Sequence, residues 1–467
     1  MADTVDLSFP RRIHLAGAGG AGMAAIAEVL VGMGHTVTGS DLAPSARVEH
    51  LRAIGVPVEI GHCPGNVGGA EVVAASTAIP ASNPELEEAA RRGLVVLRRA
   101  GILAGICALR RSVGVAGTHG KTTTSAMLAQ ILEGAGRQPS VILGGEMLGE
   151  GAVAPGAGGR WGEGEWLVVE ADESDSTFLQ LDLAAGLVTS VEEDHLDHFG
   201  GRQGLEEAFA AFAAQVTGPL VVCADDAAAN ALRPASKVSY GTAPDATFRV
   251  SAPTGTRWEV RSELFREEER LGWVNLRVPG AHNALNAAGA LAMAMTLGLS
   301  FEEALPGLES FAGVARRFEL LVERHGVTVV DEYAHNPGKL RAALATAAGM
   351  WDRVVAVFQP HRYSRTAALS EQLAEALTGA DVVVVTPVYS AGEDAIPGVT
   401  AGRLAAQLRA LGANEVHLVL DLDDLEPVLD GLLRPGDLCL ALGAGDLSDR
   451  MRQYVKGHSH GDGHSHG

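Results

Sequence analysis

Short apolar runs, several of them rich in valine, recur along the chain, and a glycine-rich or polar segment follows each one. Residues 13–16 and 113–115 are such runs, and the apolar spacing behind them, over residues 23–33 and 124–132, predicts helices. The last third repeats the alternation, with predicted strands at residues 327–330, 354–358, 382–386 and 438–442. Strands that alternate with helices are typical of parallel sheets, so the pattern predicts an α/β fold.

The length of 467 residues suggests about three domains, and the strand series begins anew near residues 110 and 314. The low-complexity His-rich end cannot pack and is expected to be disordered, with at most an adventitious metal affinity. The predicted parts are an N-terminal Rossmann-like domain (1–110), a central domain (111–313), a C-terminal Rossmann-like domain (314–455) and a His-rich disordered tail (456–467).

Composition limits the partners and the compartment. A formal charge of −21 argues against nucleic acid, because a phosphate backbone needs a surface rich in lysine and arginine. The first nine residues do not resemble a signal peptide, and polar residues interrupt the uncharged stretch 281–301, so we expect no membrane insertion and a cytoplasmic protein. Four widely spaced cysteines are predicted to be buried free thiols in a reducing compartment: Cys63, Cys107, Cys223 and Cys439.

The sequence Gly-Thr-His-Gly-Lys-Thr-Thr, residues 117–123, joins the strand at 113–115 to the following helix. A glycine loop at a helix N-terminus presents backbone N–H groups to an anion, Lys121 would neutralise the β- and γ-phosphates, and Thr122 would hold Mg²⁺. The common pattern has glycine where this chain has Val115. A plain glycine turn would not require Lys-Thr, so we predict a central P-loop-type ATPase domain that binds ATP or GTP.

A second glycine loop follows the first strand. Gly17, Gly19 and Gly22 satisfy the spacing G-x-G-x-x-G, and Asp41 ends the next strand about 20 residues later, as in dinucleotide-binding folds. Alone, this loop would favour an NAD-dependent dehydrogenase. Such an enzyme has no use for a triphosphate site, so the pyrophosphate of another nucleotide diphosphate is the alternative ligand.

Acidic residues follow two strands of the central domain. Glu170 opens a segment with four acids among residues 170–175, and His195 lies in a second acidic segment after the strand at 185–191. Because the carboxyl ends of parallel strands meet at one edge, both segments can converge on the phosphate loop. One acid alone would be a solvated loop residue, whereas two clusters favour Mg²⁺ or Mn²⁺.

Polar residues also open a later helix and follow other strands. His282, Asn283 and Asn286 share one face of a first helical turn and suit a purine base or a phosphate, although Asn283 could be only an N-cap. The remaining candidates for substrate contacts are Ser76 and Thr77, for which ordinary turn residues are the alternative, and Arg362 and Arg365, which would bind a carboxylate or a phosphate.

Six segments occur in a fixed order along the chain: residues 17–23, 117–124, 170–175, 282–286, 316–319 and 358–366. In this order they resemble the Mur ligases, the ATP-dependent amide-bond-forming ligases of peptidoglycan synthesis. The resemblance covers nearly all of residues 10–455 and is closest to the branch that adds L-alanine to UDP-N-acetylmuramate. It implies a UDP-sugar-binding domain, a central ATPase domain, and a C-terminal domain that admits the amino acid and closes over ATP.

The resemblance also implies a mechanism and roles for residues. ATP would phosphorylate the lactyl carboxylate of UDP-N-acetylmuramate, with Mg²⁺ (or Mn²⁺) as cofactor, and L-alanine would displace the phosphate. The catalytic residues would be Lys121, Glu170, His195 and Arg317, and the metal ligands Thr122, Glu170 and His195. ATP would contact Gly117, Thr118, His119, Gly120, Lys121, Thr122, Thr123, Asn283, Asn286, Arg317 and Glu332. The other substrates would contact Gly17, Gly19, Gly20, Gly22, Met23, Asp41, Ser76, Thr77, His335, Arg362 and Arg365.

Two positions depart from the family pattern, which usually has aspartate at Glu332 and histidine at Asn336, so the role of Glu332 stays open. The ligase that recycles murein tripeptide onto the same UDP-sugar is an alternative, but it typically has tyrosine at Ser174 and lacks this first glycine loop. A dehydrogenase or a GTP-driven switch would leave the acidic segments and the last domain unexplained. The sequence leaves open a monomer or a homodimer, and the choice among L-alanine, glycine and L-serine.

Overall fold

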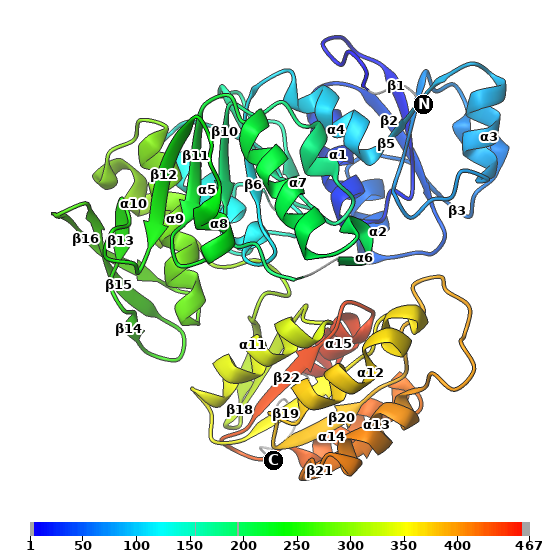
Figure 1. The fold of residues 1–467 in the computed structure, drawn as a ribbon. Helices are drawn as coiled ribbons and strands as arrows, with labels where there is room; N and C mark the ends of the chain where they lie inside the picture. The colour runs from blue at the N-terminus through cyan, green and yellow to red at the C-terminus, as the bar shows by residue number, and fades with distance from the viewer. Residues whose placement is uncertain (1–3, 155, 194–195, 460–467) are drawn as a thin grey trace, which may run out of the picture. The chain divides into compact units, whose positions relative to one another are not determined.

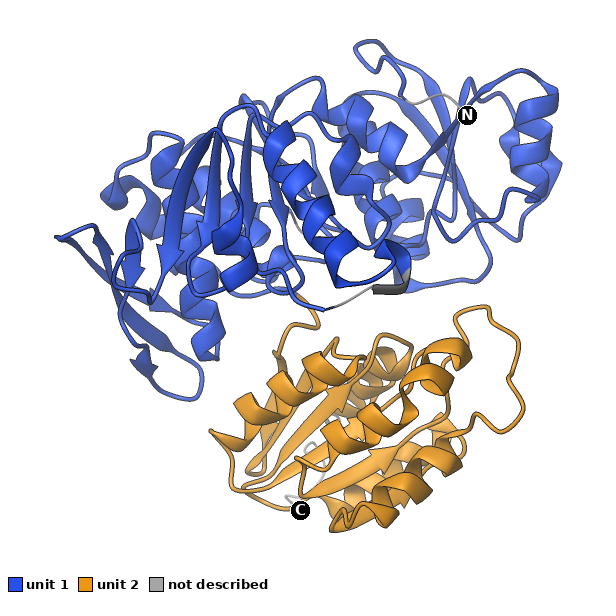
Figure 2. Ribbon diagram, in the orientation of Figure 1, with its two compact units in different colours: residues 1–314 blue, residues 315–467 orange. Residues whose placement is uncertain are grey.

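The computed structural model describes residues 4–154, 156–193 and 196–459 (Figure 1). It divides into two compact units, residues 1–314 and 315–467 (Figure 2). Over the described ranges the strands form three sheets, two in the first unit and one in the second. The expected α/β architecture with three sheet-containing domains is confirmed.

The first sheet has the strand order β3-β2-β1-β4-β5, and every pair is parallel. The order reverses between β1 and β4, which is where open α/β sheets bind their ligands. Its strands are β1 (Arg12–Ala16), β2 (Thr36–Asp41), β3 (Val58–Ile60), β4 (Val72–Ala75) and β5 (Val95–Arg98). Its helices are α1 (Ala21–Gly32), α2 (Ala46–Ala53), η1 (Pro64–Val67), α3 (Pro84–Arg91) and α4 (Arg99–Cys107).

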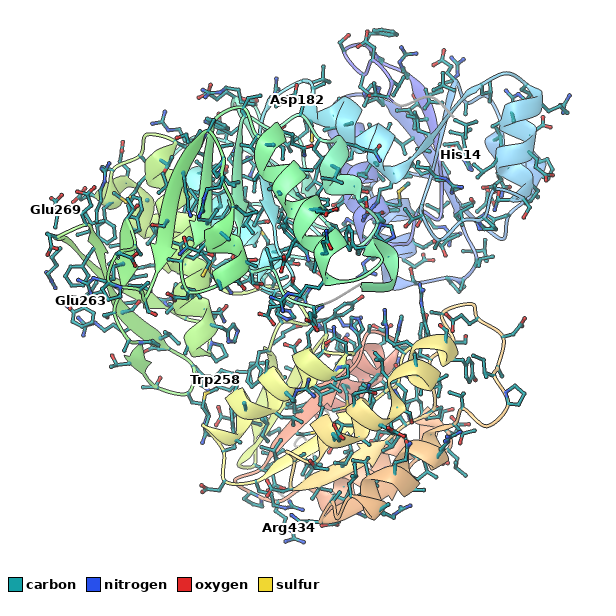
Figure 3. The ribbon with its side chains drawn as sticks, viewed as in Figure 1. His14, Asp182, Trp258, Glu263, Glu269 and Arg434 are labelled. Atoms are coloured by element: carbon teal, nitrogen blue, oxygen red, sulfur yellow. The ribbon has the colours of Figure 1, made fainter. Side chains whose placement is uncertain are left out.

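The central sheet has the order β14-β15-β13-β12-β11-β10-β6-β9-β7-β8, with β16 beside β15. Its strands are β6 (Arg111–Ala116), β7 (Ser140–Ile142), β8 (Gly159–Arg160), β9 (Trp166–Glu170), β10 (Ala185–Val188), β11 (Pro219–Cys223), β12 (Ser236–Gly241), β13 (Phe248–Val250), β14 (Thr254–Gly255), β15 (Val260–Arg266) and β16 (Glu269–Leu276). Its helices are α5 (Lys121–Gly134), η2 (Thr177–Gln180), α6 (Leu196–Phe199), α7 (Arg202–Gln215), α8 (Ala227–Ala231), α9 (Ala281–Thr296) and α10 (Phe301–Glu309). The strands β7, β9, β6, β10, β11, β12 and β13 are parallel, and the antiparallel hairpin of β15 and β16, which carries Glu263 and Glu269, extends one edge (Figure 3).

The second unit contains one sheet of order β17-β18-β22-β19-β20-β21, parallel except for β17. Its strands are β17 (Glu319–Arg324), β18 (Val327–Glu332), β19 (Val354–Phe358), β20 (Val382–Val385), β21 (Glu415–Leu418) and β22 (Leu438–Leu442). Its helices are α11 (Pro337–Ala348), α12 (Tyr363–Leu377), α13 (Ala401–Ala410), η3 (Leu422–Asp424), α14 (Leu425–Leu432) and α15 (Leu447–Ser459).

One hydrophobic core joins the first sheet to the central sheet. Side chains alternate along the central strands, so Val113 and Val115 face the core under α5, α9 and α10. Leu167 and Val169 face the opposite side, where Phe212 of α7 belongs to the same buried cluster as the first sheet and its helices. The apolar surface of the first sheet's domain is therefore partly covered by the central domain.

A buried carboxylate fastens the same junction. Glu28 of α1 accepts hydrogen bonds from the backbone N–H groups of Ala157 (2.9 Å) and Gly159 (2.7 Å). Its Oε1 lies 2.6 Å from Nε2 of His50. Burial raises the pKa of Glu28, and the N–H groups and His50 oppose that rise. The three partners satisfy the hydrogen-bonding capacity of a carboxyl group that is mostly shielded from water.

Three details of the chain differ from or add to the sequence-based picture. Cys107, Cys223 and Cys439 are buried, but Cys63 is exposed, and its prediction as a buried thiol is wrong. Cys63 precedes the surface turn η1, where its thiol donates to Asn66 Oδ1 (3.0 Å). Apolar residues nearby in the sequence therefore do not make this cysteine buried. Helix α15 reaches Ser459, so residues 456–459 of the expected tail are helical. None of the helices within the described ranges is long and apolar enough to cross a membrane.

Candidate active site

The loop between β6 and α5 has a shape that only glycine permits at two positions. Gly117 has φ +135°, and a Cβ there would lie 2.1 Å from Thr189 Oγ1. Gly120 has φ +79°, and a Cβ there would lie 2.5 Å from Asn286 Oδ1. Larger residues would be strained and would push away the neighbouring segments. The loop is therefore wrapped closely by the end of β10 and by α9.

Hydrogen bonds from the segment after β10 fix the loop. Thr118 N donates to Ser190 O (3.0 Å), and His119 N donates to Ser190 Oγ (3.1 Å). Glu192 N donates to Thr118 Oγ1 at 2.9 Å. Thr123 follows at the start of α5 and is partly exposed. The backbone around residues 117–120 is thus preorganised at the N-terminus of α5, where an anion is favoured.

Lys121 is held by a buried carboxylate. Its Nζ lies 2.8 Å from Glu173 Oε2 and donates to Gly117 O at 2.6 Å, while the Glu173 side chain is only 2 % exposed. Burial alone would lower the pKa of Lys121, but Glu173, Asp172 and Glu170 outweigh it and raise that pKa. Lys121 is therefore a charged ammonium group next to the loop.

Thr122 and Glu170 form a pair of oxygen donors beside the loop. Thr122 Oγ1 donates to Glu170 Oε1 (3.0 Å), and Glu170 Oε2 accepts from Gly144 N (2.7 Å). Within the described ranges no group of three or more His, Cys, Asp and Glu residues could hold a metal ion by itself. His195, the other expected ligand, lies outside the described residues.

The first turn of α9 brings two amides to the same place. Asn286 Nδ2 donates to Asn283 Oδ1 (3.0 Å), and Asn283 Nδ2 donates to Pro279 O (2.6 Å). The side chain of Asn283 thus holds its partner beside Gly120. Burial lowers the pKa of His282 on the same turn. The structure brings together the phosphate loop, Lys121, the Thr122–Glu170 pair and Asn286.

The first glycine loop is built differently. Gly17 has φ +79° and a Cβ there would lie 3.0 Å from Ser76 Cβ, so the ends of β1 and β4 meet. Asp41 at the end of β2 accepts from Gly19 N (2.8 Å). Of the other expected contact residues on this side, Gly20 is the N-cap of α1, Met23 is buried, and Thr77 is exposed. The loop thus lies at the ends of β1 and β4, where the strand order of the sheet reverses.

The second unit holds Arg317 and Glu332 close together. Phe318 N donates to Glu332 Oε2 (2.8 Å), and the Arg317 guanidinium carbon lies 5.1 Å from the centre of the Tyr333 ring. Burial raises the pKa of Glu332, and Arg317 opposes that rise. The Glu332 side chain thus reaches the backbone of Phe318, whose φ is +49°.

A histidine cluster lies beside these residues in the same unit. The rings of His335 and His361 have centres 5.8 Å apart, and His361 stacks on Tyr389 at 5.5 Å. Arg365 Nη1 lies 3.4 Å from His361 Nδ1, and Arg362 has φ +69° at the start of α12. Burial, Arg365 and Arg362 lower the pKa of His361 to about 4.

Two residues that lie in these clusters were not singled out from the sequence. Glu173 was only one of several acids, and nothing in the spacing says which of them meets Lys121. His361 lies between the predicted strand and Arg362, inside the segment that carries the family resemblance. Its position in that segment is the signal that could have selected it.

Comparison with known proteins gives the family. The model of the Mur ligase family catalytic domain matches residues 12–111, and that of the Mur ligase middle domain matches residues 115–294. The model of the Mur ligase glutamate ligase domain matches residues 316–445. The chain belongs to the Mur ligase family. The expectation from the six segments is confirmed.

The relatives of this Mur ligase span nearly its whole length. The UDP-N-acetylmuramate–L-alanine ligase of Nitratidesulfovibrio vulgaris strain DP4 is 43% identical over 454 residues, which are 96% of this chain and 99% of the relative. The ligase of the same name from Sorangium cellulosum is 40% identical and covers 95% of both chains. The UDP-N-acetylmuramate-alanine ligase of Thermotoga maritima has a solved structure with a TM-score of 0.83 and 30% identity, covering 96% of this chain and 99% of the other. A murein peptide ligase from Psychrobacter arcticus shares the fold, with a TM-score of 0.70, 22% identity, and coverage of 96% and 98%.

The wrapped loop makes Gly117 the most sensitive glycine of the site. Gly117→Ala places a Cβ 2.1 Å from Thr189 Oγ1, so the loop must shift, and we expect kcat/KM for ATP to fall by about a hundredfold or more. Gly431→Ala is the matched control, because a Cβ there meets no atom within 4 Å. Steady-state kinetics and thermal melting of both variants check this; equal activity of the two would contradict it.

The neutral His361 makes the second unit sensitive to acid. Its pKa is 6.5 in an unfolded chain and about 4 in the fold, so only the unfolded chain takes up a proton between these values. The unit should therefore lose stability as the pH falls from about 6.5 to 4. His361→Asn removes this contribution, and the difference in melting temperature between wild type and variant should shrink over that interval. A difference that is constant with pH would count against a neutral, buried His361.

Proposed function

We propose that this Mur ligase joins L-alanine to the lactyl carboxylate of UDP-N-acetylmuramate, with conversion of ATP to ADP and phosphate. The observation that carries the proposal is the convergence of Lys121, the Thr122–Glu170 pair and Asn286 on one glycine loop. The relatives that match over nearly the whole chain are named for this reaction, and the proposed substrates are taken from those names. We expect the reaction to take place in the cytoplasm, where ATP is available.

The chemistry needs charge neutralisation and positioning more than a protein nucleophile. A carboxylate oxygen of the substrate takes the γ-phosphoryl group, ADP leaves, and an acyl phosphate remains. The amine of L-alanine then attacks the acyl carbon, loses a proton, and inorganic phosphate leaves with the oxygen that it had received. Lys121 and the backbone N–H groups of residues 117–120 would stabilise the negative charge on the transferring group.

The Thr122–Glu170 pair fits Mg²⁺. A hydroxyl and a carboxylate oxygen that lie 3.0 Å apart are hard ligands, and Mg²⁺ usually takes few protein ligands and completes its shell with water and phosphate oxygens. Thr122, Glu170 and His195 would hold the ion, which when bound supplies positive charge to the phosphate oxygens. Glu170 is already oriented by its hydrogen bond from Gly144.

The family resemblance also gives roles to residues of the second unit. Arg317 would bind the γ-phosphate, and the nearby charge of Glu332 would help to orient the Arg317 guanidinium. His335, Arg362 and Arg365 would contact the amino acid or the muramoyl carboxylate. This assignment makes turnover depend on closure of the C-terminal domain over ATP.

Phosphate release from ATP tests the activity. We expect release that requires both UDP-N-acetylmuramate and L-alanine, and Lys121→Ala should lower kcat/KM by at least about a hundredfold because the charge at the transferring group is lost. Lys237→Ala, at an exposed lysine, is the control. Release with L-Ala-D-Glu-diaminopimelate and not with L-alanine would assign the chain to tripeptide recycling. Absence of release with every acceptor would overturn the ligase proposal.

The metal assignment predicts a specific defect. Glu170→Gln keeps the size of the side chain and removes its charge, so the Mg²⁺ concentration for half-maximal rate should rise at least about tenfold. Glu165→Gln, at a carboxylate whose side chain is 61% exposed, should leave the titration unchanged. The measurement is the initial rate against total Mg²⁺ at saturating substrates. An unshifted midpoint in Glu170→Gln would remove Glu170 from the metal site.

A further inference from the structure

Arg99, the first residue of α4, lies between the first glycine loop and the acidic segment that follows β9. Its side chain is 19% exposed. A Cβ built on Gly22 would lie 3.0 Å from Arg99 Nη1 and 3.6 Å from Cδ, so the guanidinium rests against the first turn of α1. A side chain at position 22 would therefore displace the guanidinium. None of the roles described above uses Arg99.

The acidic segment holds one end of this guanidinium. Arg99 Nη2 donates to Asp175 Oδ2 (2.8 Å) and lies 3.4 Å from Asp172 Oδ2. Together with Lys121, Arg99 lowers the pKa of Asp172 to about 2 against the effect of burial. Both nearby acids sit on the segment that also carries Glu173, the partner of Lys121. The guanidinium is therefore fixed in direction, with Nη2 toward the acids and Nη1 toward Gly22.

Among the described residues, the other nitrogen atoms of Arg99 have no hydrogen-bond partner. Nε is buried and has no hydrogen-bond acceptor, and Nη1 donates to no residue of the described ranges. The neighbouring Arg98 differs, because its Nη1 donates to the backbone oxygen of Ile79 (2.6 Å). A buried N–H of a charged group that lacks an acceptor is costly. The free side of Arg99 is consistent with an anionic ligand that completes its hydrogen bonds.

We propose that Arg99 binds the diphosphate of the UDP-sugar at the first glycine loop and is positioned for this by Asp175 and Asp172. The diphosphate of a nucleotide sits at the N-terminus of the helix after such a loop, which is where Nε and Nη1 are available. A planar guanidinium can donate two parallel hydrogen bonds to phosphate oxygens. This inference rests on the proposed function, since the UDP-sugar is the ligand.

The same contacts have a competing explanation. Arg99 could serve only as a brace between α4 and the acidic segment, in which case its loss would disturb the position of Glu173 and Lys121. If Arg99 is only a brace, its loss weakens the binding of ATP. If Arg99 binds the diphosphate, its loss weakens the binding of the UDP-sugar. The two explanations therefore differ in which Michaelis constant changes, and in whether the phosphates of the inhibitor matter.

The experiment compares Arg99→Gln, Arg99→Lys and Asp175→Asn, with Arg111→Gln at a guanidinium that is 59% exposed as the control. In the full-length enzyme, Arg99→Gln should raise KM for UDP-N-acetylmuramate and the inhibition constant of UDP about ten- to a hundredfold. The inhibition constant of uridine and KM for ATP should change by less than about threefold. Arg99→Lys, which keeps the charge, should recover part of the loss. Asp175→Asn should give a smaller rise that disappears in the Arg99→Gln background, since neighbouring groups are not additive.

Each outcome decides the question. Equal losses for UDP and uridine, or a rise in KM for ATP with unchanged KM for the UDP-sugar, would overturn the proposal in favour of a brace. If Arg99→Gln does not melt cooperatively near the wild-type temperature, Arg99→Lys and Asp175→Asn carry the same comparison. The proposed function itself is tested separately by the wild-type enzyme. If the wild type does not turn over L-alanine and UDP-N-acetylmuramate, the proposed function is wrong, whatever the Arg99 variants show.

Discussion

The buried ion pair between Lys121 and Glu173 is the interaction on which the central site depends. An ammonium group in this position would lose its charge without a nearby anion, because burial opposes ionisation. The acidic segment after β9 supplies that anion and lies against the loop because β9 and β6 are adjacent parallel strands. Glu170 begins the same segment and holds Thr122. One stretch of chain thus positions both Lys121 and two of the three expected metal ligands, Thr122 and Glu170.

The acidic segment also reaches the first domain through Arg99. The repulsion among its carboxylates is relieved by two cations, Lys121 at the start of α5 and Arg99 at the start of α4. Removing Lys121 would leave the buried Glu173 carboxylate without its cation, which is more costly than losing a surface pair. The two loops are therefore linked by charge as well as by the hydrophobic core that the first and central sheets share.

Much of this architecture is readable from the sequence, because β-branched strands, glycine loops and helical periodicity are local signals. The strands β19 and β22 appear with their full extent, and the start of α5 is misplaced by only a few residues. Contacts between distant segments are not local. Nothing in the spacing shows that Glu173 rather than Asp172 meets Lys121, that Asp41 bonds to Gly19, or that Arg99 lies on Gly22. The sequence also did not show that Cys63 is exposed, because its exposure depends on the position of the turn η1 in the fold.

The shared core has a consequence for synthesis of the chain. The first domain leaves the ribosome before β9 and α7, whose apolar faces complete its core. At ordinary translation rates the delay is on the order of 10 s, during which an incompletely covered apolar surface is open to other chains. Such a surface is what chaperones bind, so the nascent first domain is a natural client of the folding machinery until the central domain arrives.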